Sequence, residues 1–216
     1  MNLSENISDL FSCLMIIFLF ISISLLLEVN EDKKRITDMA SSHMQTKELI
    51  YIALTNEFAN DLEKWNAEIT DDLTIRFTNP EILFDGGSSE IQEEYKRILD
   101  NFFPRYISTI SDFVNVIDTI SIDGHTDSTG WNDCTDECSY FRNMYLSQMR
   151  SFNTLEYCAS LVNDNLIIAN KFVATGLSYS RPITDEDGTV IDSLSKRVEF
   201  TIRLDMQKTL DSIATL

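Results

Sequence analysis

The sequence predicts a single N-terminal transmembrane α-helix followed by one α/β domain, with helices packed on a single sheet. Three features lead to this prediction: a long uncharged apolar segment near the N-terminus, a polar helical region after it, and a later alternation of strand-like and helix-like segments. The chain has 216 residues, which suits one ordinary domain plus a smaller element.

The apolar segment covers residues 10–27 and contains no charged residue, Gly or Pro. At ~1.5 Å per residue it spans about 27 Å, close to the hydrocarbon thickness of a bilayer. A cleavable signal peptide is the alternative. However, residues 1–9 contain no Lys or Arg, and Leu27-Glu28-Val29 is a poor cleavage site. We therefore expect a retained transmembrane helix at 10–27, preceded by a short tail at 1–9.

Residues 28–70 are polar and lack Pro and Gly, and their apolar positions recur at mixed three- and four-residue steps. This pattern predicts a helical linker with a break near Ser41-Ser42. Such a helix can pair with a second copy of itself or pack on the domain that follows.

From residue 71 to residue 205 the pattern changes and predicts an α/β domain of the βαβαββ type, followed by a C-terminal tail at 206–216. A turn and helix start are expected at Asp85-Gly86-Gly87-Ser88, and a kink is expected at Pro104. Alternating apolar residues predict strands at 73–77, 116–122, 172–174 and 198–204, and helical spacing predicts helices at 91–113 and 143–162.

Composition excludes several classes of function. The chain carries 17 Lys and Arg against 35 Asp and Glu, so its net charge of −18 argues against a nucleic-acid partner. We find no Ser-His-Asp order, metal-ligand set or spaced carboxylate pair, so we expect no enzyme activity, no cofactor and no metal. His125 beside Asp127 is the nearest catalytic candidate, and a structural histidine at a strand end is the alternative.

Two polar segments mark a candidate ligand site. Gly124-His125-Thr126-Asp127-Ser128 lies at the end of a predicted strand, and residues 143–151 lie at the start of the next predicted helix. Because sheet proteins present polar groups at such positions, Asp127 and Arg150 are expected to face one cleft. The pair would suit a zwitterion, with Asp127 binding an ammonium group and Arg150 a carboxylate. A simple Asp127–Arg150 bridge between loop and helix is the alternative.

These segments, followed by Lys196-Arg197-Val198-Glu199-Phe200, resemble the OmpA-like peptidoglycan-binding domain, which also ends the flagellar stator subunit MotB. The resemblance covers residues 71–205. It implies that Asp127 and Arg150 bind the diaminopimelate of the cell-wall peptide. The further peptidoglycan-binding positions that it implies are Thr126, Asn143, Leu146 and Ser147.

The chain departs from the family pattern in two places. Before the last strand, Lys196-Arg197 replaces the usual Arg-Arg, and Ser195 replaces the common Asn. The segment between Gly130 and Asn143 is longer than in the family and contains Trp131. This insertion can reshape or cover the cleft.

The insertion also carries two cysteines, Cys134 and Cys138. Being four residues apart in a loop, they can form a local disulfide in an oxidising compartment, with two free thiols or half of a metal site as alternatives. Cys13 and Cys158 are expected to be lone packed thiols.

Asp9 immediately precedes the apolar segment. On its own, an acid here is an N-cap or first-turn residue that favours the helix dipole. However, Asp9 followed by Leu-Phe-Ser-Cys-Leu-Met-Ile-Ile-Phe-Leu resembles the transmembrane signature of stator proteins, which implies that Asp9 is the ion-carrying carboxylate. A charged carboxylate is costly at membrane depth, which favours the uptake of a proton.

The stator resemblance also implies partners. A lone helix cannot enclose an ion pathway, so a polytopic MotA-like subunit is required, with five copies expected around a homodimer of this chain. The short C-terminal tail and the segments 146–151, 176–182 and 197–200 are most similar to the MotB-like subunit of the Zorya anti-phage system. That similarity implies a proton-driven motor that signals indirectly to cytoplasmic effectors. A flagellar-type stator subunit and a passive membrane-tethered peptidoglycan anchor are the alternatives.

Two signals for membrane orientation disagree. The basic run Lys33-Lys34-Arg35 follows the apolar segment, which by the positive-inside rule would place the C-terminal side in the cytoplasm. The domain resemblance instead implies a single-pass inner-membrane protein with a cytoplasmic N-terminus and a periplasmic, cell-wall-binding C-terminal domain. We follow the domain signal, because nearby acidic residues dilute the basic run.

Overall fold

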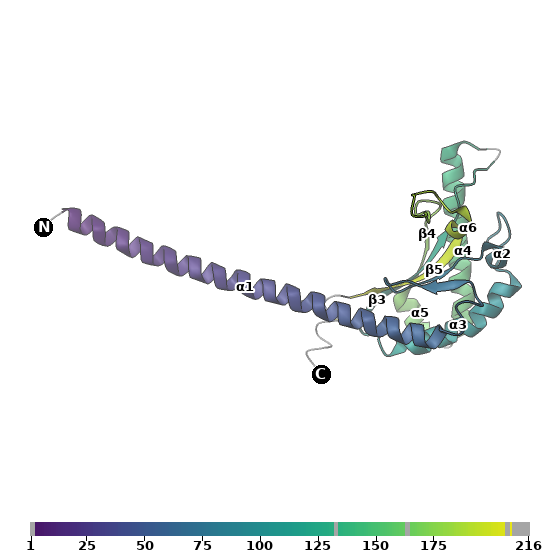
Figure 1. Ribbon diagram of the computed structural model, residues 1–216, viewed down its shortest axis with the longest axis horizontal. Helices are drawn as coiled ribbons and strands as arrows, with labels where there is room; N and C mark the ends of the chain where they lie inside the picture. Colours follow the sequence, from purple (N-terminus) through teal and green to yellow (C-terminus); the bar gives the residue numbers. More distant parts are fainter. Residues whose placement is uncertain (1–2, 132–133, 163–164, 206–207, 209–216) are drawn as a thin grey trace.

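The computed structural model describes residues 3–131, 134–162, 165–205 and 208, with side chains described from Phe11 onward except at 165 and 166. Figure 1 shows one long helix that leads into an α/β domain. In chain order the elements are α1 (Leu3–Phe58), β1 (Ala67–Ile69), β2 (Thr74–Phe77), α2 (Pro80–Leu83), α3 (Glu93–Ser111), β3 (Ile117–His125), α4 (Asp136–Ser160), α5 (Asn165–Lys171), β4 (Phe172–Gly176), α6 (Asp192–Ser195) and β5 (Arg197–Leu204).

Helix α1 is continuous from the apolar segment to the domain. It runs through Ser41-Ser42, so the predicted break there does not occur, and it ends at Phe58 rather than near residue 70. Because no Gly or Pro interrupts this stretch, nothing in its backbone chemistry stops the helix earlier. Among the described residues, α1 is the one helix long and apolar enough to cross a membrane.

The C-terminal end of α1 is part of the domain core. Ile50, Leu54 and Phe58 are fully buried, and the Phe58 ring lies 5.2 Å from the ring of Phe102 on α3. Arg105, also on α3, stacks 5.0 Å above Phe58 and donates a 2.6 Å hydrogen bond to Glu57. Burial of three large apolar side chains contributes about 1.5–3 kcal/mol each, so packing outweighs the partly exposed ion pair. The helix is therefore fixed to the domain rather than loosely tethered.

The sheet confirms the predicted α/β class. Its strand order is β1-β2-β5-β3-β4, with β3 and β4 parallel and the other pairs antiparallel. All four predicted strands are present, whereas β1 and α5 were not predicted from the sequence. Helix α3 continues through Pro104 to Ser111, but it begins at Glu93 rather than at the 85–88 turn.

Helix α4 also begins earlier than predicted, at Asp136 instead of residue 143. Thr135 caps it by accepting a 3.3 Å hydrogen bond from the backbone N–H of Cys138, and Asp136 and Glu137 lie in its first turn, where acids favour the helix dipole. Asn143 therefore lies about two turns inside the helix. The polar first turns carry no apolar periodicity, which is why the pattern did not reveal them.

The two faces of the sheet differ in chemistry because successive strand residues point to opposite sides. The helix-covered face is aromatic, and Phe200 on β5 lies 5.1 Å from Phe102 and 5.9 Å from Phe77, ring to ring. The opposite face carries Arg76, Arg197 and Glu199, whose carboxylate accepts 2.6 Å hydrogen bonds from both arginines.

Two glycines allow α4 to pack closely on the sheet. Gly124 on β3 and Gly176 on β4 are paired in register beneath α4. A Cβ at Gly124 would overlap the carbonyl oxygen of Ser147, and one at Gly176 would lie 2.6 Å from Cα of Gln148. Any larger side chain would therefore have to displace helix backbone.

We expect Gly176→Ala to destabilise the chain by about 2 kcal/mol, because the added methyl group meets backbone atoms that cannot rotate away. Chemical denaturation of the detergent-solubilised chain, followed by circular dichroism, measures this. Gly86→Ala is the matched control, since a Cβ there has nothing within 4 Å. Equal stability of the two variants would contradict the close-packing argument.

Candidate functional site

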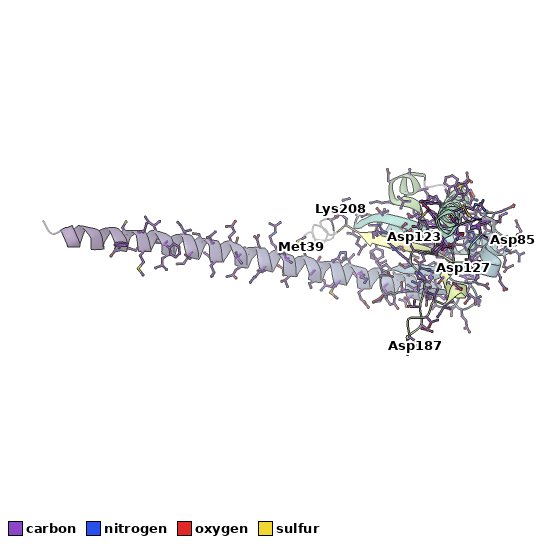
Figure 2. The ribbon with its side chains drawn as sticks, turned by 90° about the horizontal axis from the view of Figure 1, so that it is seen from above. Met39, Asp85, Asp123, Asp127, Asp187 and Lys208 are labelled. Carbon is purple, nitrogen blue, oxygen red and sulfur yellow. A yellow bond between two sulfur atoms is a disulfide. The ribbon has the colours of Figure 1, made fainter. Side chains whose placement is uncertain are left out.

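The candidate site is a cavity at the end of the domain far from the start of α1, where Figure 2 places Asp85 and Asp127. The C-terminal end of β3, the middle of α4 and the loop at 85–88 meet there. The cavity has a volume of about 360 Å³. Its lining includes the predicted site residues Thr126, Asp127, Asn143, Leu146 and Arg150, together with Lys196.

Asp127 is held as a charged carboxylate at one side of this cavity. Lys196 Nζ lies 2.9 Å from Oδ2, and the hydroxyl and backbone N–H of Thr129 donate to the carboxylate at 2.7 and 3.3 Å. Burial raises the pKa of Asp127, but the hydrogen bonds and charge of Lys196 and the bonds from Thr129 outweigh it, so the net pKa is lowered. Asp127 is therefore negative at neutral pH.

Arg150 lies in the same cavity and is positioned by the loop before α3. Its Nε donates to the carbonyl of Ser88 at 2.8 Å and its Nη2 to that of Asp85 at 3.1 Å. The guanidinium also stacks 4.9 Å above the Phe84 ring. Burial lowers the pKa of Arg150 to about 10, with Asp127 opposing that shift, so the group stays charged at neutral pH.

Asp127 and Arg150 therefore line one cavity, as the sequence predicts. They do not form the direct salt bridge that was the alternative. Within the described residues, the ion partner of Asp127 is Lys196, and the hydrogen bonds of Arg150 go to backbone carbonyls. Lys196 and the 85–88 turn are thus site residues that the sequence did not predict. The charge of Lys196 and the glycines of the turn are visible in the sequence, but both segments lie far along the chain from the residues that they contact.

The other predicted residues have different placements. Asn143 donates to the carbonyl of Thr129 at 3.2 Å and accepts a 3.4 Å hydrogen bond from Trp131 Nε1, so it ties the insertion to the cavity wall. Ser147 is fully buried behind the cavity, where its hydroxyl accepts from the backbone N–H of Ser178 at 2.9 Å. Ser147 thus positions the loop after β4.

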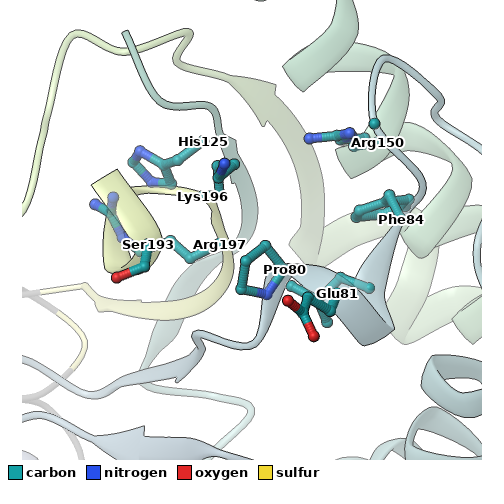
Figure 3. A pocket seen from close by; sticks show the side chains of 10 residues that line it. Pro80, Glu81, Phe84, His125, Arg150, Ser193, Lys196 and Arg197 are labelled. Carbon is teal, nitrogen blue, oxygen red and sulfur yellow. The ribbon is translucent and has the colours of Figure 1, made fainter. Parts of the chain in front are cut away.

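A second cavity of about 340 Å³ adjoins the first. Figure 3 shows Arg150 beside Phe84 on one side and His125, Lys196 and Arg197 on the other. Both cavities are lined by Gly86, Arg150 and Lys196, so these two cations separate them.

His125 is a buried strand residue in the second cavity. Its Nε2 lies 3.2 Å from Oε2 of Glu199. Burial is the largest influence on the pKa of His125 and lowers it, although Glu199 opposes the shift, so the ring is neutral at pH 7. Neither ring nitrogen has a hydrogen-bond partner among the described residues, so the structural and the catalytic readings of His125 both stay open.

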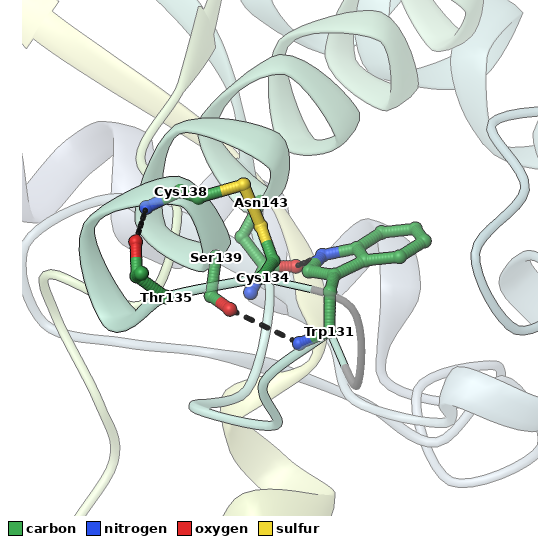
Figure 4. Close-up of a disulfide and its surroundings, with 6 residues drawn as sticks. All are labelled: Trp131, Cys134, Thr135, Cys138, Ser139 and Asn143. Carbon is green, nitrogen blue, oxygen red and sulfur yellow. Dashed lines mark hydrogen bonds between the residues drawn. A yellow bond between two sulfur atoms is a disulfide. The ribbon is translucent and has the colours of Figure 1, made fainter.

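The insertion after Gly130 is organised by a disulfide. Cys134 and Cys138 are bonded, with their Cα atoms 5.5 Å apart, and the backbone N–H of Trp131 donates to Ser139 Oγ at 3.1 Å (Figure 4). The structure therefore has the disulfide rather than the alternatives of free thiols or a half metal site. Of the other cysteines, Cys158 is a buried free thiol as predicted, and Cys13 is a free thiol within the apolar part of α1, where it is exposed in the isolated chain.

The remaining expectations concern Asp9 and metal binding. Asp9 lies within α1, but its side chain falls outside the described residues. Within the described part of the chain, no group of three or more His, Cys, Asp or Glu side chains is placed to hold a metal ion.

No family model matches the chain. The chain is 39% identical over 202 residues to Zorya protein ZorB of Escherichia coli, covering 91% of this chain and 86% of that protein.

Among solved structures, a putative MotB-like protein from Desulfovibrio vulgaris has a TM-score of 0.55 at 20% identity, covering 77% of this chain and 96% of that one. The cell wall anchor of the T6SS from Pseudomonas aeruginosa has a TM-score of 0.50 at 20% identity, covering 70% and 97%. The two structures share the fold of the domain.

Glu199 gives a prediction about pH. Burial raises its pKa, but His125 and Arg197 outweigh this and hold the net pKa well below its usual range. A lowered pKa stabilises the fold above the unfolded pKa of about 4.3, and this stabilisation is lost as pH falls toward the folded pKa. Glu199→Gln should therefore cost about 3 kcal/mol at pH 7 and progressively less below pH ~4.

Urea denaturation of the wild-type chain and of the Glu199→Gln variant, each at pH 7 and at pH 3, tests this expectation. Glu94→Gln, which removes an exposed carboxylate from α3, is the control and should change little at either pH. A stability difference for Glu199→Gln that stays constant between the two pH values would refute it.

Proposed function

The chain belongs to the ZorB family of MotB-like proteins, and on this premise we propose that it is the peptidoglycan-anchored subunit of a proton-driven inner-membrane motor in Zorya anti-phage defence. The observation that carries the proposal is the cavity where Asp127, Lys196 and Arg150 converge, at the end of the domain opposite the apolar helix. The same polypeptide thus joins a candidate wall-binding site to a candidate membrane segment.

The charges in the cavity suit the zwitterionic end of diaminopimelate. The ligand ammonium binds the carboxylate of Asp127, and the ligand carboxylate binds Arg150, which two carbonyl acceptors already hold in place. Lys196 is 39% exposed at its side chain, so it can turn from Asp127 to the ligand carboxylate. Two charge-assisted contacts contribute about 1.5–3 kcal/mol each, enough for selective binding of the wall peptide.

Helix α1 supplies the membrane anchor and a spacer. Its apolar side chains between Phe11 and Val29 are exposed in the isolated chain, which is the surface that a bilayer or a membrane partner would cover. The 31 residues from 28 to the end of the helix at Phe58 extend it by about 46 Å. We infer that the helix enters from a cytoplasmic N-terminus and holds the domain in the periplasm, at a distance from the membrane.

Asp9 is the proposed proton carrier. Each proton that crosses the membrane releases about 2.3 kcal/mol per 100 mV of potential. Because one helix cannot enclose a path for protons, the motor requires a polytopic MotA-like partner, which we propose surrounds a homodimer of this chain as five copies. Protonation and deprotonation of Asp9 would drive steps in that partner, and cytoplasmic effectors would respond to its motion. We propose no catalytic reaction for this chain.

For the wall-binding step, Asp127→Ala and Arg150→Ala should each reduce binding to purified peptidoglycan sacculi at least tenfold, because each removes one half of the zwitterion site. Co-sedimentation of the detergent-solubilised chain with sacculi measures the effect. Arg97→Ala, which removes an exposed arginine on α3, and Asp187→Ala, on a projecting loop (Figure 2), are the controls. Undiminished binding by both site variants would exclude this cavity as the wall-binding site.

For the motor step, Asp9→Asn should lower phage protection to the level of cells that lack the chain, since an amide cannot exchange a proton at this position. Sedimentation with sacculi should be unchanged. Asp9→Glu keeps the carboxyl group and should retain part of the protection, and Glu28→Gln controls for loss of an acid at the other end of the apolar segment. Full protection by Asp9→Asn would leave a passive anchor as the function.

A further inference from the structure

An exposed aromatic groove lies beside the candidate cavity. It has a volume of about 580 Å³ and is formed mainly by Trp131 of the insertion and by Phe141, Arg142, Tyr145, Leu146 and Met149 of α4. Phe141 and Tyr145 are 62% and 70% exposed. Their four-residue spacing places both rings on the same side of the helix. We call this surface the aromatic groove.

Two rings of the aromatic groove, those of Trp131 and Phe141, have partners that hold them before any ligand binds. Trp131 is fixed by hydrogen bonds to Ser139 and Asn143, and the Arg142 guanidinium lies 5.5 Å from its ring. The ring of Phe141 packs edge-on against Tyr140 at 5.6 Å. Aromatic side chains that are already held bind a ligand at little cost in conformational entropy, so the placement of Trp131 and Phe141 suits recognition.

The aromatic groove is continuous with the candidate wall-binding cavity. Gly87, Trp131 and Leu146 line both. A ligand whose charged end lies between Asp127 and Arg150 therefore meets the groove as it leaves the cavity past Trp131.

The lining of the groove also restricts the chemistry of its occupant. In a chain with 35 acidic residues, the groove lining contains no Asp or Glu among its described residues and one cation, Arg142. It therefore suits a ligand that is mainly neutral and has apolar faces. A second copy of this chain is the competing occupant, but the continuity of the groove with the candidate wall-binding cavity favours part of the same ligand.

We propose that the aromatic groove binds the glycan strand of peptidoglycan, through the N-acetylated amino sugars next to the peptide held in the cavity. Sugar rings present C–H groups on their faces, which pack on aromatic rings, and their acetamido methyl groups add apolar contact. The wall peptide is covalently attached to such a sugar, so one ligand can occupy the cavity and the groove together. This inference rests on the proposed wall-binding function, which it extends from the peptide to the sugar.

The test uses the full chain in detergent and two ligands: a disaccharide-tetrapeptide from peptidoglycan, and the same peptide after its sugars have been removed. The wild-type chain should bind the sugar-bearing ligand about tenfold more tightly in calorimetry. The double variant Phe141→Ala/Tyr145→Ala should lose that tenfold gain and keep the affinity for the sugar-free peptide. Phe152→Ala is the matched control, because Phe152 is 48% exposed on the same helix but lies outside the groove.

The inference is overturned if the two ligands bind the wild-type chain equally, or if the double variant keeps the full gain. It is also overturned if the double variant alters only the oligomeric state in light scattering, since the groove would then bind a second copy. A soluble oligomer of N-acetylglucosamine separates this inference from the proposed function. Its binding should be lost in the double variant and kept in Asp127→Ala. If Asp127→Ala still binds the sugar-free peptide, the proposed wall-binding function fails. Binding of the N-acetylglucosamine oligomer by the wild-type chain and by the double variant then decides the proposal for the groove.

Discussion

The close approach of α4 to the ends of β3 and β4 is the constraint on which the candidate site depends. Gly124 and Gly176 leave no side chain between the sheet and the backbone of Ser147 and Gln148. With the helix in this position, Arg150 reaches the carbonyls of the 85–88 loop, and Asn143 reaches the loop after β3. A Cβ at either glycine would overlap this backbone, so the helix or the sheet would have to shift.

Charge pairing maintains a cationic site in an acidic protein. The chain carries a net charge of −18, yet Arg150, Lys196 and Arg197 converge on two adjoining cavities. Each of these cations has an acceptor: backbone carbonyls for Arg150, Asp127 for Lys196 and Glu199 for Arg197. Because buried charges are costly unless they are paired and hydrogen-bonded, these acceptors are what allow the two buried arginines, Arg150 and Arg197, to lie beside the more exposed Lys196.

The proposed anchor and the proposed ion site are connected by a single helix. Since α1 is unbroken and its last turns are buried in the domain, a force on the domain reaches the apolar segment without an intervening flexible joint. Helix α3 completes this connection through Phe102 and Arg105, which contact Phe58 and Glu57. The proposed glycan contact at the aromatic groove would widen the proposed attachment at the far end of the domain.

The sequence by itself determined the elements whose signal is local. Uniform apolar composition marked residues 10–27, alternation marked the strands of the domain, and strand-end and helix motifs brought Asp127 and Arg150 to one cavity. The tertiary structure alone decided that Lys196 pairs with Asp127, that Ser88 and Asp85 position Arg150, that β1 joins the sheet edge and that Trp131 lies beside α4. These contacts join segments that are distant in sequence or lack periodicity, and their partners are set by how the helices pack on the sheet. No pattern within one segment encodes that packing, whereas helix and strand periods repeat within a few residues and can be recognised directly.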